Sequence, residues 1–164
     1  MTPVPPGSTI GIIGGGQLGR MLGMAAAQLG YRCHIYAPER SGPAADVCAQ
    51  WTQGDYGDAE KLLAFAHDVS VVTFEFENID PAPLKPLAGA KPLFPPLRAL
   101  EIGQDRIAEK RFAMELGGRT APWAAVNNRA DLDDAIDTVG VPAILKTVRL
   151  GYDGKGQVRL KTAG

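Results

Sequence analysis

The chain has 164 residues and carries 17 Lys and Arg against 18 Asp and Glu, for a formal net charge of −1. This length is enough for one good core and short for two complete domains. The basic residues are dispersed, so nothing indicates a nucleic acid partner, and no apolar stretch approaches the ~20 residues of a membrane span.

Residues 1–8 lack the basic and apolar regions of a signal peptide and predict a short disordered lead. Cys33 and Cys48 fit no metal-binding spacing, which favours reduced thiols and a cytoplasmic location.

The first element is a buried strand that runs into a glycine-rich turn. Thr9–Ile13 predicts the strand, and residues 17–29 predict the helix that follows. Between them, Gly14, Gly16 and Gly19 satisfy G-x-G-x-x-G, which permits a tight turn, close approach of the backbone to a phosphate and close packing of helix and strand. The helix N-terminus adds partial positive charge and N–H donors. The motif therefore predicts a site for a phosphate-bearing ligand.

Taken alone, the same motif suggests a dinucleotide site. Such a site needs an acid at the end of the second strand, about 20 residues further on, to hold the ribose. The second strand is expected at residues 32–36 and runs into Ala37-Pro38. Glu39 follows the proline, where we expect it to be displaced into the loop. An NAD-dependent oxidoreductase domain stays open as one interpretation.

Strands and helices alternate up to about residue 95, which predicts a Rossmann-like parallel sheet with further elements at 50–53, 58–67 and 69–74. Glu75 and Glu77 directly follow the last of these strands. Period-two alternation places the two acids on one side, and Phe74 and Phe76 on the other. Ligands of open α/β sheets bind outside the carboxyl ends of the strands, so Glu75 should share a crevice with the glycine turn. Two solvated strand-end carboxylates are the alternative interpretation.

The second half of the chain begins after two proline-rich segments, 81–86 and 92–96. The later one is expected to contain a short edge strand, where prolines are tolerated. Beyond it the sequence predicts helices at 97–102, 105–116 and 131–139, followed by a hairpin of strands at 141–146 and 157–161. The order of elements therefore predicts a second, smaller α+β region.

A glycine-rich loop joins the two strands of this hairpin. Gly151, Gly154 and Gly156 leave backbone N–H groups unshielded, so that these groups can converge on phosphate oxygens. Lys146 adds a point charge from the strand that leads into the loop. The loop is not a Walker A motif, because Lys155 is followed by glycine rather than by Ser or Thr at the start of a helix.

Lys146 and the segment Gly151-Tyr152-Asp153-Gly154-Lys155-Gly156-Gln157 resemble the nucleotide-binding hairpin of ATP-grasp carboxylate–amine ligases. Together with Gly-Gln-Leu-Gly-Arg-Met in the first turn, this motif is similar to those of the N5-carboxyaminoimidazole ribonucleotide synthetase family of purine biosynthesis. The resemblance runs from Ile10 to Leu160. It implies a substrate-binding pre-ATP-grasp domain over 9–103 and a partial ATP-grasp domain over 104–164. Lys155 stands where arginine is common in relatives, which keeps the charge but loses the bidentate fork.

The resemblance also implies which residues bind. The ATP-binding residues would be Arg106, Lys146, Gly151, Tyr152, Asp153, Gly154, Lys155, Gly156 and Gln157, with Lys155 in a catalytic role. The substrate-binding residues would be Gly15, Gly16, Gln17, Leu18, Glu75, Tyr152 and Asp153. The spacing of Arg106 and Lys110 is equally typical of a solvated basic helix face. The ligands of Mg²⁺ are expected outside this chain.

In this family ATP phosphorylates bicarbonate to carboxyphosphate, and the carboxyl group passes to the amine of 5-aminoimidazole ribonucleotide. The resemblance thus implies three small-molecule substrates and a homodimer in the full-length protein. It also implies an inactive fragment, because the adenine pocket and the acids that hold Mg²⁺ would lie beyond Gly164. Glycinamide ribonucleotide transformylase and biotin carboxylase share this domain organisation and stay open as alternatives. A non-catalytic module that binds a nucleotide or a partner is a further alternative.

Overall fold

The computed structural model describes residues 3–151 and 154–162. The chain divides into two compact units, one up to Glu101 and one from Ile102 onward, two residues before the boundary expected from the sequence. Helix α4 (Leu97–Gly103) carries the chain from the first unit into the second. Within the described part of the chain, no helix is long and apolar enough to cross a membrane.

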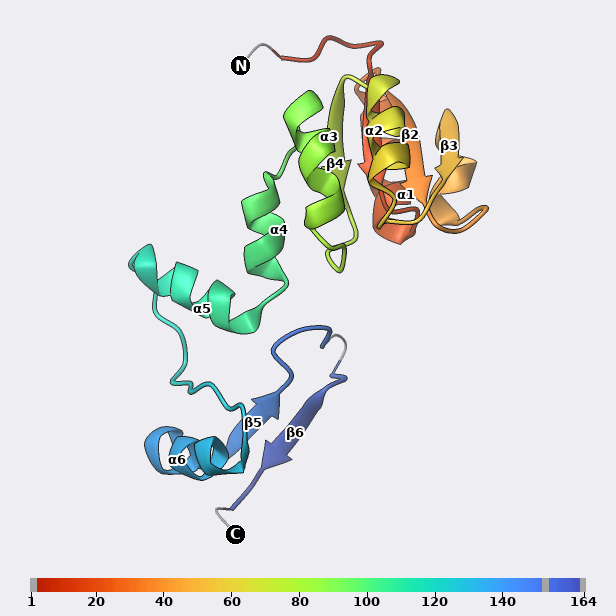
Figure 1. Ribbon diagram of the computed structural model, residues 1–164. Coiled ribbons are helices and arrows are strands. Elements are labelled where there is room, and N and C mark those ends of the chain that lie inside the picture. Colours follow the sequence, from red (N-terminus) through yellow and green to blue (C-terminus); the bar gives the residue numbers. More distant parts are fainter. Residues whose placement is uncertain (1–2, 152–153, 163–164) are drawn as a thin grey trace. The chain divides into compact units, whose positions relative to one another are not determined.

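The first unit is built on a four-stranded parallel sheet in the order β3-β2-β1-β4 (Figure 1). Its strands are β1 (Thr9–Ile13), β2 (Arg32–Ala37), β3 (Gln50–Gln53) and β4 (Val71–Phe74). Ile13 of β1 stands in register with Tyr36 of β2 and Phe74 of β4. The carboxyl ends of these three strands therefore lie side by side, and the turns that follow them meet at one edge of the sheet.

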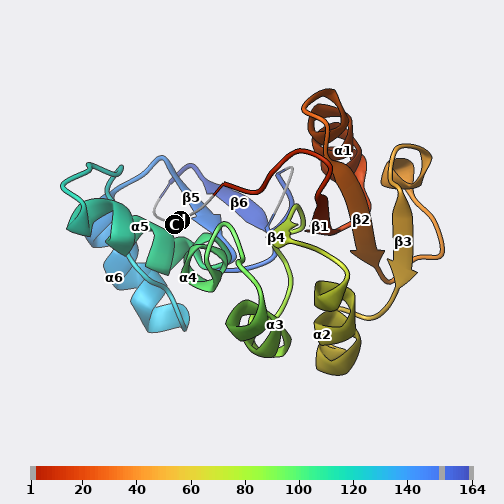
Figure 2. The same ribbon diagram turned by 90° about the horizontal axis from the view of Figure 1, so that it is seen from above.

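Helices cover both faces of this sheet. Figure 2 shows α1 (Gln17–Gln28) on one face, and α2 (Ala59–His67) and α3 (Lys85–Ala90) on the other. On the α1 side, Ala26 belongs to a buried cluster with Ile12 and Ile35. On the α2 side, Leu62 and Phe65 belong to a cluster that includes Ile13 and Tyr36. The alternation of side chains along β1 and β2 supplies both layers, and the predicted order of strands and helices is confirmed.

Strand β4 is shorter than the sequence predicts. Val69 still belongs to the turn that closes α2, since its N–H donates to the carbonyl oxygen of Ala66, so the strand begins at Val71. The edge strand expected within 92–96 is reduced to a single parallel bridge between Val72 and Leu93. Prolines lie on both sides of this bridge and cannot donate to a ladder, which limits the pairing to one residue.

The N-terminal segment differs from the disordered lead that the sequence predicts. Gly7 donates its N–H to the Gly30 carbonyl oxygen at 2.7 Å, and Tyr31 donates its hydroxyl to the Val4 carbonyl oxygen at 2.8 Å. Ser8 accepts at its carbonyl oxygen from the N–H of Arg32 at 3.0 Å. These bonds tie the segment to the start of β2.

The second unit contains α5 (Arg106–Glu115), α6 (Arg129–Val139) and an antiparallel pair, β5 (Ala143–Lys146) and β6 (Gln157–Leu160). Asp105 caps α5 by accepting from the N–H groups of Ile107 and Ala108 at 2.9 and 3.0 Å. The helix expected at 131–139 begins two residues earlier, because Asn128 caps it by accepting from the N–H of Asp131 at 3.0 Å. Two 3-10 turns, η1 (Pro43–Asp46) and η2 (Ala82–Leu84), complete the first unit.

Candidate active site

The glycine turn after β1 takes a conformation that only glycine adopts easily. Gly14 has a φ of 113°, and its N–H donates to the Tyr36 carbonyl oxygen at 2.9 Å. A Cβ placed on Gly14 would lie 2.6 Å from Cγ of Glu75. The first glycine of the motif therefore allows both the turn and the close approach of the acid that follows β4.

Glu75 lies against this turn and is held there by two hydrogen bonds. Its N–H donates to the Ile13 carbonyl oxygen at 3.0 Å, and its Oε1 accepts from the N–H of Gly16 at 2.9 Å. Gly16 is the N-cap of α1, so the carboxylate sits at the positive end of the helix, where negative charge is favoured. The structure confirms that Glu75 and the glycine turn share one edge of the sheet. Its role towards a ligand stays a prediction.

These residues border a cleft of about 320 Å³ in the first unit. Its lining consists of Gly15, Gly16, Glu39, Ser41, Gly42, Pro43, Tyr56, Glu75 and Phe76. The expectation that Phe76 lies on the opposite side from Glu75 was wrong, because β4 ends at Phe74 and the alternation does not continue beyond it. Gln17 and Leu18 begin α1, are exposed and are not part of this lining.

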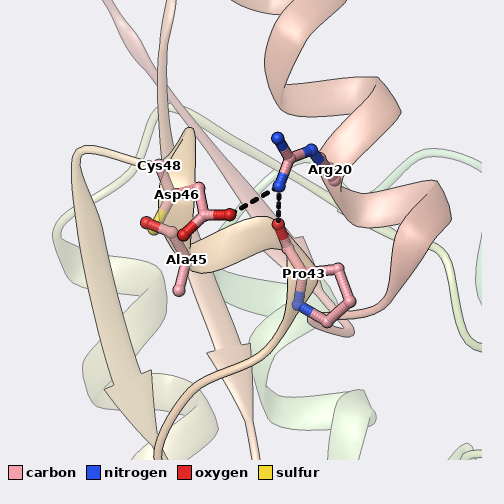
Figure 3. Close-up of polar contacts among 5 residues, drawn as sticks. All are labelled: Arg20, Pro43, Ala45, Asp46 and Cys48. Carbon is pink, nitrogen blue, oxygen red and sulfur yellow. Dashed lines mark hydrogen bonds and ion pairs between the residues drawn. The ribbon is translucent and has the colours of Figure 1, made fainter.

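The outer wall of the cleft is formed by the turn at residues 41–43, which α1 fixes in place. Arg20 donates from Nη1 to the Pro43 carbonyl oxygen at 3.2 Å and pairs with Asp46 Oδ2 at 2.6 Å (Figure 3). The N–H of Ala44 donates to the Gly15 carbonyl oxygen at 3.1 Å. Arg20, from the same motif as the glycines, therefore acts within the protein by positioning this wall.

Two aromatic side chains line the cleft: Phe76, which was expected on the opposite side from Glu75, and Tyr56, which the sequence analysis did not single out. The rings of Tyr56 and Phe76 stack with their centroids 5.7 Å apart at an interplanar angle of 27°. Burial, together with the charges of Glu39 and Glu75, raises the pKa of Tyr56 to about 12, so its phenol is neutral at physiological pH. A signal for Tyr56 was present in the sequence, since it follows the carboxyl end of β3 by three residues.

Glu39 also borders this cleft. It lies outside β2, as expected of an acid displaced into the loop, and it is exposed. Its backbone carbonyl oxygen accepts from Nε1 of Trp51 at 3.0 Å, which holds the loop beside β3. Because Glu39 lines the cleft, its carboxylate is within reach of a ligand bound there.

In the second unit, Gly156 of the glycine-rich loop lies against Thr147. The N–H of Thr147 donates to the Gly156 carbonyl oxygen at 2.8 Å, and Gly156 has a φ of 67°. A Cβ on Gly156 would lie 2.6 Å from Thr147 Oγ1, so this position also requires glycine. Gly154 and Lys155 lie on the returning side of the loop, and Gln157 begins β6. The predicted ligand residues Tyr152 and Asp153 lie outside the described residues.

Arg106 holds the same loop from the start of α5. Its guanidinium donates from Nη2 to the Gly151 carbonyl oxygen at 2.7 Å and from Nε to the Thr147 carbonyl oxygen at 3.1 Å. Its N–H donates to the Val148 carbonyl oxygen at 3.1 Å. Arg106 and Lys146 also line one hollow of about 140 Å³ together with Lys110. Three cations around one hollow favour an anionic ligand.

The described residues offer no cluster of three or more His, Cys, Asp or Glu side chains that could hold a metal ion.

Comparison with known proteins identifies the family. Residues 7–104 match the ribonucleotide synthetase preATP-grasp domain, and residues 111–164 match the ATP-grasp domain. The chain belongs to the ribonucleotide synthetase family. It is 50% identical over 159 residues to the N5-carboxyaminoimidazole ribonucleotide synthase of Brucella melitensis, a match that covers 97% of this chain and 44% of the relative.

Solved structures of N5-carboxyaminoimidazole ribonucleotide synthetases have the same fold. An ADP complex of one superposes with a TM-score of 0.92 at 40% identity, covering 97% of this chain and 42% of the other. The Aspergillus clavatus synthase, in complex with ADP and 5-aminoimidazole ribonucleotide, superposes with a TM-score of 0.82 at 26% identity, covering 96% and 41% of the two chains. The chain thus spans less than half the length of these ribonucleotide synthetases.

Proposed function

We propose that this chain is part of an enzyme that carboxylates 5-aminoimidazole ribonucleotide with bicarbonate and ATP in purine biosynthesis. The first unit would bind the ribonucleotide, and the glycine loop of the second unit would bind ATP. The observation that carries the proposal is the Glu75 carboxylate, fixed 2.9 Å from the Gly16 nitrogen at the edge of a 320 Å³ cleft. This volume lies at the lower end of the ~300–1,000 Å³ typical of small-molecule sites and suits one nucleotide better than two.

The reaction needs no covalent bond to the protein. An oxygen of bicarbonate attacks the γ-phosphorus of ATP, and ADP leaves, which yields carboxyphosphate. The amine of the ribonucleotide then attacks the carboxyl carbon, phosphate leaves, and the nitrogen loses one proton. The contribution of the protein is positioning and charge stabilisation. We assign Glu75 to accept a hydrogen bond from the substrate, because a fixed carboxylate at the cleft is an acceptor for amine or hydroxyl donors.

At the glycine turn, Gly15, Gly16, Gln17 and Leu18 would receive the ribonucleotide phosphate. The Gly16 N–H donates to Glu75 in the structure, so Gly15 and Gly16 would border the phosphate while Glu75 keeps its place. Gln17 and Leu18 lie in the first turn of α1, where N–H groups have no partner within the helix, and these donors suit an anion.

On the ATP side, the proposal rests on the charges around the glycine loop. Lys146 and Lys155 would pair with phosphate oxygens, and Lys155 would have the catalytic role. Arg106 donates to two carbonyl oxygens of the loop region and would therefore set the orientation of the loop amides as well as add charge. Mg²⁺ held by acids outside this chain, a homodimeric full-length protein and a cytoplasmic location complete the proposal.

Two measurements test this function. Calorimetric titration of the chain with 5-aminoimidazole ribonucleotide and with NAD should give a measurable dissociation constant for the ribonucleotide and weak or no binding of NAD. In a chain extended to the full length of its relatives, phosphate release from ATP should require both bicarbonate and the ribonucleotide. Micromolar NAD binding with no response to the ribonucleotide would overturn the proposal in favour of a dinucleotide-binding domain.

A further inference from the structure

The Tyr56–Phe76 stack is a rigid aromatic wall beside Glu75. Tyr36 donates its hydroxyl to the Asp55 carbonyl oxygen at 2.8 Å, which fixes the turn that carries Tyr56. The rings of Tyr36 and Tyr56 lie with their centroids 6.5 Å apart, so Tyr56 is supported from the buried side of the sheet. Phe76 is the outermost ring of this series and remains 41% exposed.

Core packing does not account for the position of Phe76. Its ring has Tyr56 on one side, and a large part of its surface faces solvent next to a carboxylate. A flat apolar surface beside a fixed hydrogen-bond acceptor is the combination that recognises a heterocycle bearing an amine. The ring stacks on the aromatic face, while the amine donates to the acceptor.

We propose that the Tyr56–Phe76 stack binds the aminoimidazole ring of the substrate and thereby selects for the heterocycle. Phe76 is the contacting residue, and Tyr56 is a positioning residue that holds its ring. This inference rests on the proposed function of the same cleft and adds the group that distinguishes the ribonucleotide from a plain sugar phosphate. Glu75 and Phe76 are adjacent in sequence, so one short segment after β4 supplies both the acceptor and the stacking surface.

The test uses a chain extended to the full length of its relatives and compares three variants with the wild type. Phe76→Leu removes the aromatic face, Phe76→Tyr retains it, and Phe94→Leu is the matched control, because Phe94 has the same 41% exposure and does not line the cleft. Stacking of a base on an aromatic side chain predicts that Phe76→Leu raises KM for the ribonucleotide by about 5-fold to 100-fold. We expect KM for ATP to change less than about 2-fold, and Phe76→Tyr and Phe94→Leu to stay close to the wild type.

Ribose 5-phosphate, which lacks the heterocycle, separates stacking from a general disturbance of the cleft. Its inhibition constant should be the same in Phe76→Leu as in the wild type. A parallel loss of ribose 5-phosphate binding, or an unchanged KM for the ribonucleotide, would overturn the inference while leaving the proposed function intact. Failure of the wild-type extended chain to use the ribonucleotide would overturn both.

Phe76→Trp gives a second measurement, which does not depend on the stability of the leucine variant. Titration with the ribonucleotide should quench the added indole fluorescence, measured as the difference from the wild type, and titration with ribose 5-phosphate should not. Equal responses to the two ligands would contradict stacking at this position.

Discussion

Replacement of Gly14 by alanine tests whether the turn and Glu75 form one unit. Gly14 has a φ of 113°, where an alanine is strained by ~1–3 kcal/mol. The new Cβ would also lie 2.6 Å from Cγ of Glu75 and would push the carboxylate off the Gly16 N–H. A half-buried hydrogen bond to a charged group contributes ~1.5–3 kcal/mol. We therefore expect Gly14→Ala to lower the free energy of unfolding by about 2.5–6 kcal/mol.

The assay is urea denaturation at constant pH, with the free energy of unfolding obtained by linear extrapolation. Gly89→Ala is the control, because Gly89 lies in α3, has no atom within 4 Å of an added Cβ and lacks a positive φ. This substitution should stabilise the protein by up to ~1 kcal/mol.

A double-mutant cycle with Glu75→Ala decides between the two causes. If the alanine at position 14 acts partly by displacing Glu75, its cost should fall in the Glu75→Ala background to that of the backbone strain alone. An equal cost in both backgrounds, or a loss below ~1 kcal/mol in the wild type, would refute the reasoning from the structure.

Three further predictions concern pH, ATP and chain length. His34 is buried with Nδ1 unpartnered among the described residues, and burial lowers its pKa below the ordinary 6.5 against a smaller opposing effect of Asp68. As the pH falls, the His34 imidazole is therefore protonated in the unfolded chain before it is protonated in the folded chain. Its contribution to the free energy of unfolding should be complete above pH ~6.5 and be lost as the pH drops through the folded-state pKa. Urea midpoints measured from pH 8 to 5 should show this loss in the wild type and a smaller loss in His34→Gln. In the extended chain, Lys146→Ala should slow phosphate release from ATP at least ~10²-fold while calorimetric binding of the ribonucleotide is unchanged, and loss of both would contradict separate sites. The 164-residue chain should release phosphate from ATP far more slowly than the extended chain, and comparable rates would show that the remaining half is dispensable.

Local patterns in the sequence were sufficient for the elements and for the family. Period-two and helical apolar patterns, glycines and prolines located the four parallel strands and the hairpin to within two or three residues at their ends. The rule that parallel strands present their carboxyl ends at one edge was enough to bring Glu75 to the glycine turn, although 59 positions separate it from Gly16. The two glycine motifs were the basis of the resemblance to this family, and the family match confirms it.

The tertiary structure decided which side chains meet in the cleft. Tyr56, Phe76 and Glu39 follow three different strands, and they converge only because β2 lies between β3 and β1, with β4 on the far side of β1. Likewise, the hydrogen bond that Arg106 donates to the Gly151 carbonyl oxygen joins residues 45 positions apart. The apolar patterns of helices and strands depend on residues that are close in sequence, so they do not specify the order of strands in the sheet or such distant contacts. The sequence by itself therefore determined the elements and the family, and the packing of the sheet determined the walls of the site.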